Sequence, residues 1–151
     1  MLIRSAAIQD IPAMCDMLDA LRLESVWGTI PIEPNVSYAE AQLIQMIYHP
    51  RQLILVAEAE SNFSMLHGDL IGICAADLTS HRLLPGLTYM VEWALYVKPS
   101  CREMGIGKAL WREAVQWAKT QGAYGAAYGR IASRRNKTVV EEMVWHVFKN
   151  E

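Results

Sequence analysis

The stretch VKPSCREMGIGKAL, residues 97–110, joins a long apolar segment to an amphipathic one. Pro99 stands near its start, and Gly105 and Gly107 stand where the amphipathic segment begins. A glycine inside a helix costs about 1 kcal/mol relative to alanine, so helix stability does not explain the pair. We interpret the stretch as a strand-to-helix turn whose bare backbone approaches a ligand.

The ligand predicted at this turn is an anion. Backbone N–H groups at a helix start have no partner within the helix, and the helix dipole favours negative charge there. Glycine at these two positions removes the side chains that would keep a phosphate group away from those N–H groups. Lys108 and Arg112 add positive charge in the first turns, where the dipole alone favours acids.

Two common phosphate-binding patterns do not fit the turn. A P-loop requires glycine where Arg102 stands and serine or threonine where Ala109 stands. A dinucleotide-binding fingerprint requires a third glycine where Leu110 stands. The pattern that remains is Arg-x-x-Gly-x-Gly between a strand and a helix.

The composition is that of an ordinary globular protein. The chain has 151 residues, of which 52% are hydrophobic, and its net charge is −2. We expect one domain, residues 1–151. A charge this small does not favour nucleic acid as a partner, and the local basic cluster is interpreted as a solvated helix surface: Arg130, Arg134, Arg135 and Lys137.

The cysteines and the apolar runs exclude further classes. Cys15, Cys74 and Cys101 form no C-x-x-C pair and no Cys/His spacing, so we expect neither a disulfide framework nor a metal. The first residues lack the apolar core of a signal peptide, and no apolar run is long enough to span a bilayer. We therefore expect a cytoplasmic protein without a membrane partner.

Apolar spacing predicts an α/β (α+β) fold. Residues 2–5, 52–60, 70–78, 87–97 and 123–132 have strand character, and the second and third of these form a hairpin. Helical spacing covers residues 10–24, 37–48, 106–121 and 133–148. The predicted order is β-α-α-β-β-β-α-β-α, a mixed, mainly antiparallel central sheet flanked by about four helices.

The glycine turn and its flanks resemble the acyl-CoA-binding motif of the GNAT superfamily of N-acetyltransferases. That motif is an apolar strand ending in Val-x-Pro, a short turn, Arg/Gln-x-x-Gly-x-Gly/Ala, and a helix with leucine three residues further on. The matching positions are Val97, Pro99, Arg102, Gly105, Gly107 and Leu110. The opening segment IRSAAIQDIPAM, residues 3–14, is similar to the first strand and helix of the same family.

The resemblance implies a binding site for acetyl-CoA as acyl donor and a direct transfer without a metal. Main-chain groups of Leu95, Tyr96 and Val97 would pair with the pantetheine arm as an added strand does. Asn136, near the start of the predicted last helix, would face the cofactor arm. The backbone that would hold the pyrophosphate comprises Arg102, Glu103, Met104, Gly105, Ile106, Gly107 and Lys108.

Glu92 is the candidate catalytic base. It is the only carboxylate in residues 87–97, and a charge in so apolar a strand requires an explanation. Acetyl transfer to an amine needs a group that accepts the amine proton, directly or through water. The alternative interpretation is an outward-facing or ion-paired residue on a half-exposed strand.

The general acid is not selected by the sequence. The family's usual acid is a tyrosine on the last helix, seven residues after the asparagine, and Met143 occupies that position here. Tyr124, Tyr128 and Cys101 are alternatives, and His81 and His146 are further acid/base groups that are more often structural. The missing tyrosine keeps a second function open, in which a GNAT-like module binds acyl-CoA or a protein partner in a regulatory role without efficient turnover.

The sequence also gives expectations about the acceptor pocket and about one edge of the sheet. The resemblance implies a primary amine, on a small molecule or a protein, in a pocket formed by residues 26–35, residues 80–86 and the last helix. Trp27 and Glu33 are candidate contacts for that amine. The family usually continues into two more strands, so we expect residues 123–132 to form an exposed edge that a second copy or another protein covers.

Overall fold

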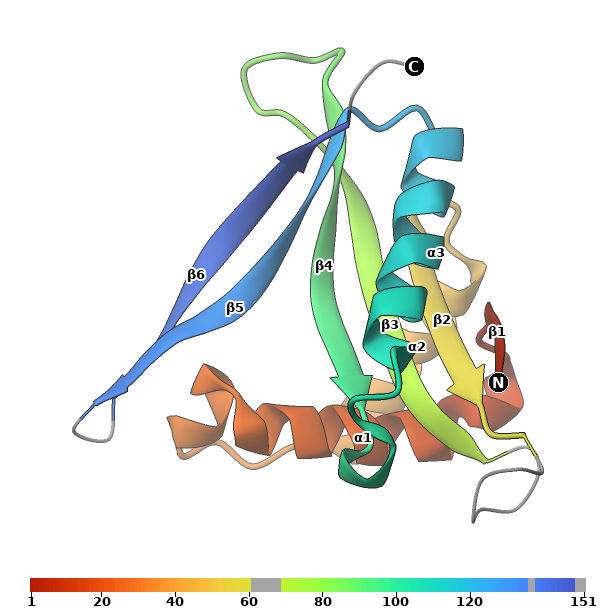
Figure 1. The fold of residues 1–151 in the computed structure, drawn as a ribbon, viewed down its shortest axis with the longest axis vertical. Helices are drawn as coiled ribbons and strands as arrows, with labels where there is room; N and C mark the ends of the chain where they lie inside the picture. Colours follow the sequence, from red (N-terminus) through yellow and green to blue (C-terminus); the bar gives the residue numbers. More distant parts are fainter. Residues whose placement is uncertain (61–68, 136–137, 149–151) are drawn as a thin grey trace.

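The fold is a twisted six-stranded sheet with helices on both faces (Figure 1). The computed structural model describes residues 1–60, 69–135 and 138–148. Neighbouring strands are antiparallel except for the fourth and fifth, which are parallel, and this confirms the predicted mixed, mainly antiparallel sheet. The strands, in sheet order, are β1 (Leu2–Ser5), β2 (Gln52–Glu58), β3 (Leu70–Ser80), β4 (Thr88–Val97), β5 (Gly125–Arg135) and β6 (Thr138–Val147).

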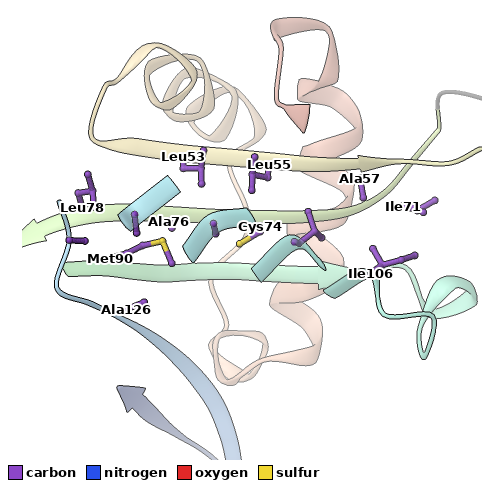
Figure 2. Packing of buried hydrophobic residues seen from close by; sticks show 14 of the residues in the cluster. Leu53, Leu55, Ala57, Ile71, Cys74, Ala76, Leu78, Met90, Ile106 and Ala126 are labelled. Atoms are coloured by element: carbon purple, nitrogen blue, oxygen red, sulfur yellow. The ribbon is translucent and has the colours of Figure 1, made fainter. Parts of the chain in front are cut away.

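The helices divide the core into two layers. The α-helices are α1 (Ile11–Glu24), α2 (Val36–Tyr48) and α3 (Ile106–Thr120), and the short 3-10 turns are η1 (Ile8–Asp10), η2 (Val26–Thr29) and η3 (Pro99–Cys101). Helices α1 and α2 pack on one face through residues such as Met14, Met17 and Leu43. Helix α3 covers the other face (Figure 2).

Helix α3 lies close to the sheet because of its residue spacing. Its buried positions, Ile106, Leu110, Ala114 and Ala118, recur every four residues and therefore share one face. The two alanines add little side-chain bulk toward the core formed by β2, β3 and β4, and all four positions are nearly shielded from solvent. This packing fixes the start of α3 at the C-terminal end of β4.

The predicted last helix, residues 133–148, is wrong. The described residues contain three α-helices, and their order ends in β5 and β6 rather than in a strand and a helix. Val140, Met143, Val144 and Val147 satisfy helical spacing, but the segment is rich in β-branched residues. It pairs with β5 along its whole length, so tertiary pairing decides its structure.

The predicted sheet edge is also displaced. Residues 123–132 do not form an edge, because β5 lies between β4 and β6. Among the described residues, the edge strand on this side of the sheet is β6, and β1 forms the opposite edge. The prediction of a partner chain is not tested by this arrangement, and such a partner would meet β6.

Strand β4 contains the irregularity that creates room for a site. Its register with β3 shifts between the pairs Ala75↔Ala94 and Ala76↔Glu92, which leaves Trp93 as an extra bulged residue. The bulge exchanges the two faces of the strand, because Met90 belongs to the α3-side core whereas Ala94 belongs to the α1/α2-side core.

Strands β4 and β5 separate at almost the same point. They pair only at Met90↔Ala126 and Val91↔Ala127, and the β5–β6 ribbon then diverges from β4 (Figure 1). In the described part of the chain, the β4 edge beyond Val91 therefore has no strand beside it on the β5 side.

The β5–β6 pairing can be tested at Gly125. A Cβ atom at this position would lie 2.4 Å from the carbonyl oxygen of His146 in β6. We expect Gly125→Ala to lower the free energy of unfolding by about 1–3 kcal/mol, measured by urea denaturation, because one strand has to shift. The control is Gly86→Ala, where an added Cβ meets nothing within 4 Å. Equal denaturation midpoints for the two variants would contradict the pairing.

Candidate active-site cleft

The glycine turn presents open backbone amides. After η3, Glu103 and Gly105 adopt left-handed backbone conformations, with φ of 67° and 79°. Gly105 is the N-cap of α3, and no described side chain caps that helix end. Added Cβ atoms would meet nothing within 4 Å at Gly105 and only a Val97 methyl, 3.6 Å away, at Gly107. The space beside both glycines is therefore open, and no described side chain caps the first-turn N–H groups of α3.

A cavity of about 430 Å³ lies in front of this turn. It is bounded by the C-terminal half of β4, the turn and the end of α1. Of the predicted cofactor-binding residues, Met104 does not line it, and Asn136 lies outside the described residues. The predicted residues that the cavity brings together are Leu95, Tyr96, Val97, Arg102, Glu103, Gly105, Ile106, Gly107 and Lys108.

Arg102 ties the turn to β4 and to α1. Its Nε donates to the Val97 carbonyl oxygen at 2.9 Å, and its guanidinium carbon lies 5.4 Å from the centre of the Tyr96 ring. Its Nη2 donates to both carboxylate oxygens of Glu24, at 3.0 and 2.9 Å. Both side chains are more than two-fifths exposed, so this pair contributes less than about 1 kcal/mol and is easily exchanged.

A second cavity of about 700 Å³ adjoins the first. Leu21 and Leu95 line both. The second cavity fills the region where β4 and β5 separate, and we call it the cleft. Its lining residues are Leu18, Leu21, Arg22, Ser25, Trp27, Val91, Glu92, Trp93, Ala94, Leu95, Tyr128, Gly129, Glu141 and Met143.

Glu92 lies in the cleft and is only 8% exposed, so it is not an outward-facing surface residue. Burial, together with the smaller effect of the negative charge of Glu141 on β6, raises the pKa of the Glu92 carboxyl to about 7. A carboxyl group with this pKa is partly ionised near neutral pH and can accept a proton there.

Tyr128, one of the three alternatives for the general acid, lines the same cleft. Its ring lies edge-on to Trp111 of α3, with centroids 5.1 Å apart, and stacks on His146 of β6 at 5.6 Å. The other two alternatives lie elsewhere: Tyr124 lines a separate cavity with His81, and Cys101 is 2% exposed beside the glycine turn.

The acceptor pocket differs from its prediction. Trp27 lines the cleft as expected, but Glu33 does not, and residues 80–86 contribute nothing to its described lining. Strand β6 supplies Glu141 and Met143 in place of the predicted helix. Met143 lies on this strand and is 48% exposed. The residue spacing that matched it to the family's tyrosine assumes a helix, so that match does not apply.

The described residues were also compared with the patterns typical of metal sites and of membrane-spanning helices. No three His, Cys, Asp or Glu side chains among them gather as metal ligands would. None of their helices combines the length and the apolar character that a membrane crossing requires.

Comparison with known proteins adds a family and a fold. Residues 18–137 match the sequence profile of the Acetyltransferase (GNAT) family. Among curated proteins, no sequence matches the chain significantly.

Several solved acetyltransferases share the fold. A ribosomal-protein-alanine N-acetyltransferase from Brucella melitensis is 20% identical, with a TM-score of 0.67 over 87% of this chain and 75% of that one. An aminoglycoside antibiotic 6'-N-acetyltransferase from Acinetobacter haemolyticus is 17% identical, with a TM-score of 0.66 over 85% and 78%. A glucosamine-6-phosphate N-acetyltransferase from Arabidopsis thaliana is 16% identical, with a TM-score of 0.65 over 84% and 80%.

The buried Glu92 makes stability depend on pH. Its pKa rises from 4.5 to about 7, so the folded protein binds this proton more tightly than the unfolded chain does. The free energy of unfolding of the wild type should therefore fall as pH rises through that window. Relative to the wild type, Glu92→Gln should gain ~1–3 kcal/mol between about pH 4.5 and pH 7, measured by urea denaturation.

The exposed Glu113 of α3 provides the control, because Glu113→Gln makes the same change in charge at a surface position. Its stability relative to the wild type should stay nearly constant over the same pH range. A constant difference for Glu92→Gln as well would contradict a buried, weakly acidic Glu92.

Proposed function

Because the chain belongs to the Acetyltransferase (GNAT) family, we propose that it transfers an acetyl group directly from acetyl-CoA to a primary amine. One observation carries this proposal. The cavity at the glycine turn and the cleft that holds Glu92 adjoin between α1 and β4, where they share Leu21 of α1 and Leu95 of β4. A donor held at the turn can therefore extend to a proton acceptor without leaving the protein surface.

The turn suits the pyrophosphate of acetyl-CoA. The first-turn amides of α3 have no side-chain cap among the described residues, the space beside Gly105 and Gly107 is open, and Lys108 adds positive charge there. Arg102 can exchange its exposed pair with Glu24 for a phosphate oxygen at little cost. Beyond Val91, the main chain of β4 has no described strand beside it on the β5 side, and this edge can receive the amide groups of the pantetheine arm.

The cleft residues can then move the two protons of the reaction. Acetyl-CoA supplies the acetyl group as a thioester. The Glu92 carboxylate accepts the proton that the amine nitrogen loses as it bonds to the acetyl carbon. The Tyr128 hydroxyl donates a proton to the sulfur as the carbon–sulfur bond breaks. Exchange with solvent returns both side chains to their starting states.

A second candidate function is acyl-CoA binding without efficient turnover, as in a regulatory module. The observation that favours it is the replacement of the predicted last helix by β6, which removes the position of the family's usual acid. Release of coenzyme A thiol in the presence of a panel of amines and peptides decides between the two functions.

The acetyl-CoA site can be tested by thermal unfolding. We expect saturating acetyl-CoA to raise the melting temperature of the wild type by several degrees, because ligand binds only the folded state. Gly107→Glu should abolish the shift, since its carboxylate would repel the pyrophosphate. The glycine faces open space, so this variant should still fold. Gly86→Glu adds the same charge on a distant loop and should keep the shift. No shift for the wild type at millimolar acetyl-CoA would contradict the proposal.

The base can be tested by the pH dependence of kcat/KM. Activity should rise with pH along a limb with an apparent pKa near 7, because Glu92 must be ionised. Glu92→Gln should lower kcat/KM by about 10²-fold or more and remove the limb, whereas Tyr128→Phe should lower the rate and retain it.

Deprotonation of the substrate amine also increases with pH and could produce the same limb. The variant Glu141→Gln distinguishes ionisation of Glu92 from ionisation of the amine. Removing the Glu141 charge should move the limb to lower pH if the limb reports Glu92, because this charge raises the pKa of Glu92. A limb that reports the free amine should not move. A limb that is identical in the wild type, Glu92→Gln and Glu141→Gln would exclude Glu92 as the base.

A further inference from the structure

Asp77 presents an unexplained polar atom on the α1/α2 side of the sheet. It lies on β3, directly opposite Gln52 of β2 and Val91 of β4. Its Oδ1 is buried and accepts no hydrogen bond, and it is the one such side-chain atom in the described part of the chain. A buried carboxylate oxygen without a partner is costly, and native proteins rarely keep one without a reason.

Asp77 lines a third cavity of about 400 Å³, which we call the Asp77 niche. The niche lies between the C-terminal part of α2 and the strands beneath it. Its other lining residues are Gln42, Gln45, Met46, His49, Gln52 and Trp93. It has no lysine or arginine in its described lining, so the carboxylate has no fixed cation beside it.

The polar groups around Asp77 suit a donor-rich cation. Gln42, Gln45 and Gln52 carry amide oxygens that accept hydrogen bonds, and an ammonium group has three N–H donors to satisfy. His49 is already engaged at one ring nitrogen, because its Nδ1 accepts from the Arg51 amide at 3.1 Å. A single carboxylate with neutral amides matches an ammonium group better than a divalent metal, which needs more oxygen charge.

Trp93 connects the niche to the cleft. It is the bulged residue of β4, it is 42% exposed, and it lines both cavities. Bulges re-aim side chains next to functional sites, and an indole ring attracts organic cations. A flexible chain that passes Trp93 can therefore have one end in the Asp77 niche and the other in the cleft beside Glu92.

We propose that the Asp77 niche binds a second ammonium group of the acceptor, so that the acceptor class is an α,ω-diamine or a polyamine. This inference rests on the proposed acetyl transfer for its meaning. Asp77 pairs with the distant ammonium group, Trp93 covers the connecting chain, and the reacting amine lies in the cleft. A monoamine leaves Asp77 unpaired and gains nothing from the niche.

The test measures binding without acetyl-CoA, by isothermal titration of the full chain. The probes are 1,4-diaminobutane, 1,5-diaminopentane and spermidine, with butylamine as the monoamine reference. The wild type should bind at least one of the first three about tenfold or more tightly than butylamine, as expected for a charge-assisted hydrogen bond in a shielded site. Asp77→Asn should reduce that affinity to the butylamine level, and Trp93→Leu should weaken it several-fold.

Two controls keep the result interpretable. Glu113→Gln removes the same charge from α3, on the other face of the sheet, and should bind the diamine as the wild type does. Asp77→Asn should melt no lower than the wild type, since the Oδ1 atom makes no hydrogen bond that is lost. Trp93→Leu provides an independent variant if the first one fails to fold.

The outcomes are distinct from those of the acetyl-CoA test. Equal diamine affinity in the wild type and Asp77→Asn, or no preference for any diamine over butylamine, overturns the Asp77 site. Failure of acetyl-CoA to bind would contradict the proposed function but would leave diamine binding as measured. If both bind, Asp77→Asn should raise KM for the diamine about tenfold and leave kcat nearly unchanged.

Discussion

The loss of pairing between β4 and β5 is the constraint on which the candidate site depends. Two parallel pairs, Met90↔Ala126 and Val91↔Ala127, hold the strands together, and the β5–β6 ribbon then turns away. Continued pairing would fill the cleft and cover the main chain of β4. In the part of the chain that the structure describes, the separation leaves backbone groups of β4 without a strand on the β5 side, and such groups require another partner. A ligand that adds to β4 as a strand does would supply it.

The bulge at Trp93 adds a second consequence at the same place. By exchanging the faces of β4, it buries Ala94 and Tyr96 among α1 and α2 while Leu95 and Val97 pack toward α3. It also leaves Glu92 buried at the point of separation and Trp93 between the cleft and the Asp77 niche. The glycine-turn cavity, the cleft and the Asp77 niche therefore lie one after another along β4. This order suits a donor, a proton acceptor and a distant acceptor charge.

The local features of this arrangement could be predicted from sequence. Gly105 occupies a position with positive φ, which favours glycine, and the amphipathic spacing of α3 follows it directly. The unusual carboxylate of Glu92 indicated a special environment, and the structure buries it. The features that depend on pairing between distant strands of the chain could not be predicted. Residues 138–147 satisfy helical spacing, and only pairing with β5 makes them a strand. Helical spacing therefore predicts a helix at Glu141, and the position of Trp93 near Asp77 depends on a register shift that no local pattern encodes.

The central claim is that the open edge of β4 and the first turn of α3 hold one ligand together. Amide hydrogen exchange with and without coenzyme A tests it most directly, because exchange reports the partners of individual backbone N–H groups. The account predicts that coenzyme A slows exchange in two segments, residues 92–97 and residues 105–108, and leaves β6 unchanged. Slower exchange at the turn alone, with residues 92–97 unaffected, would contradict the claim that the separated strand receives the ligand.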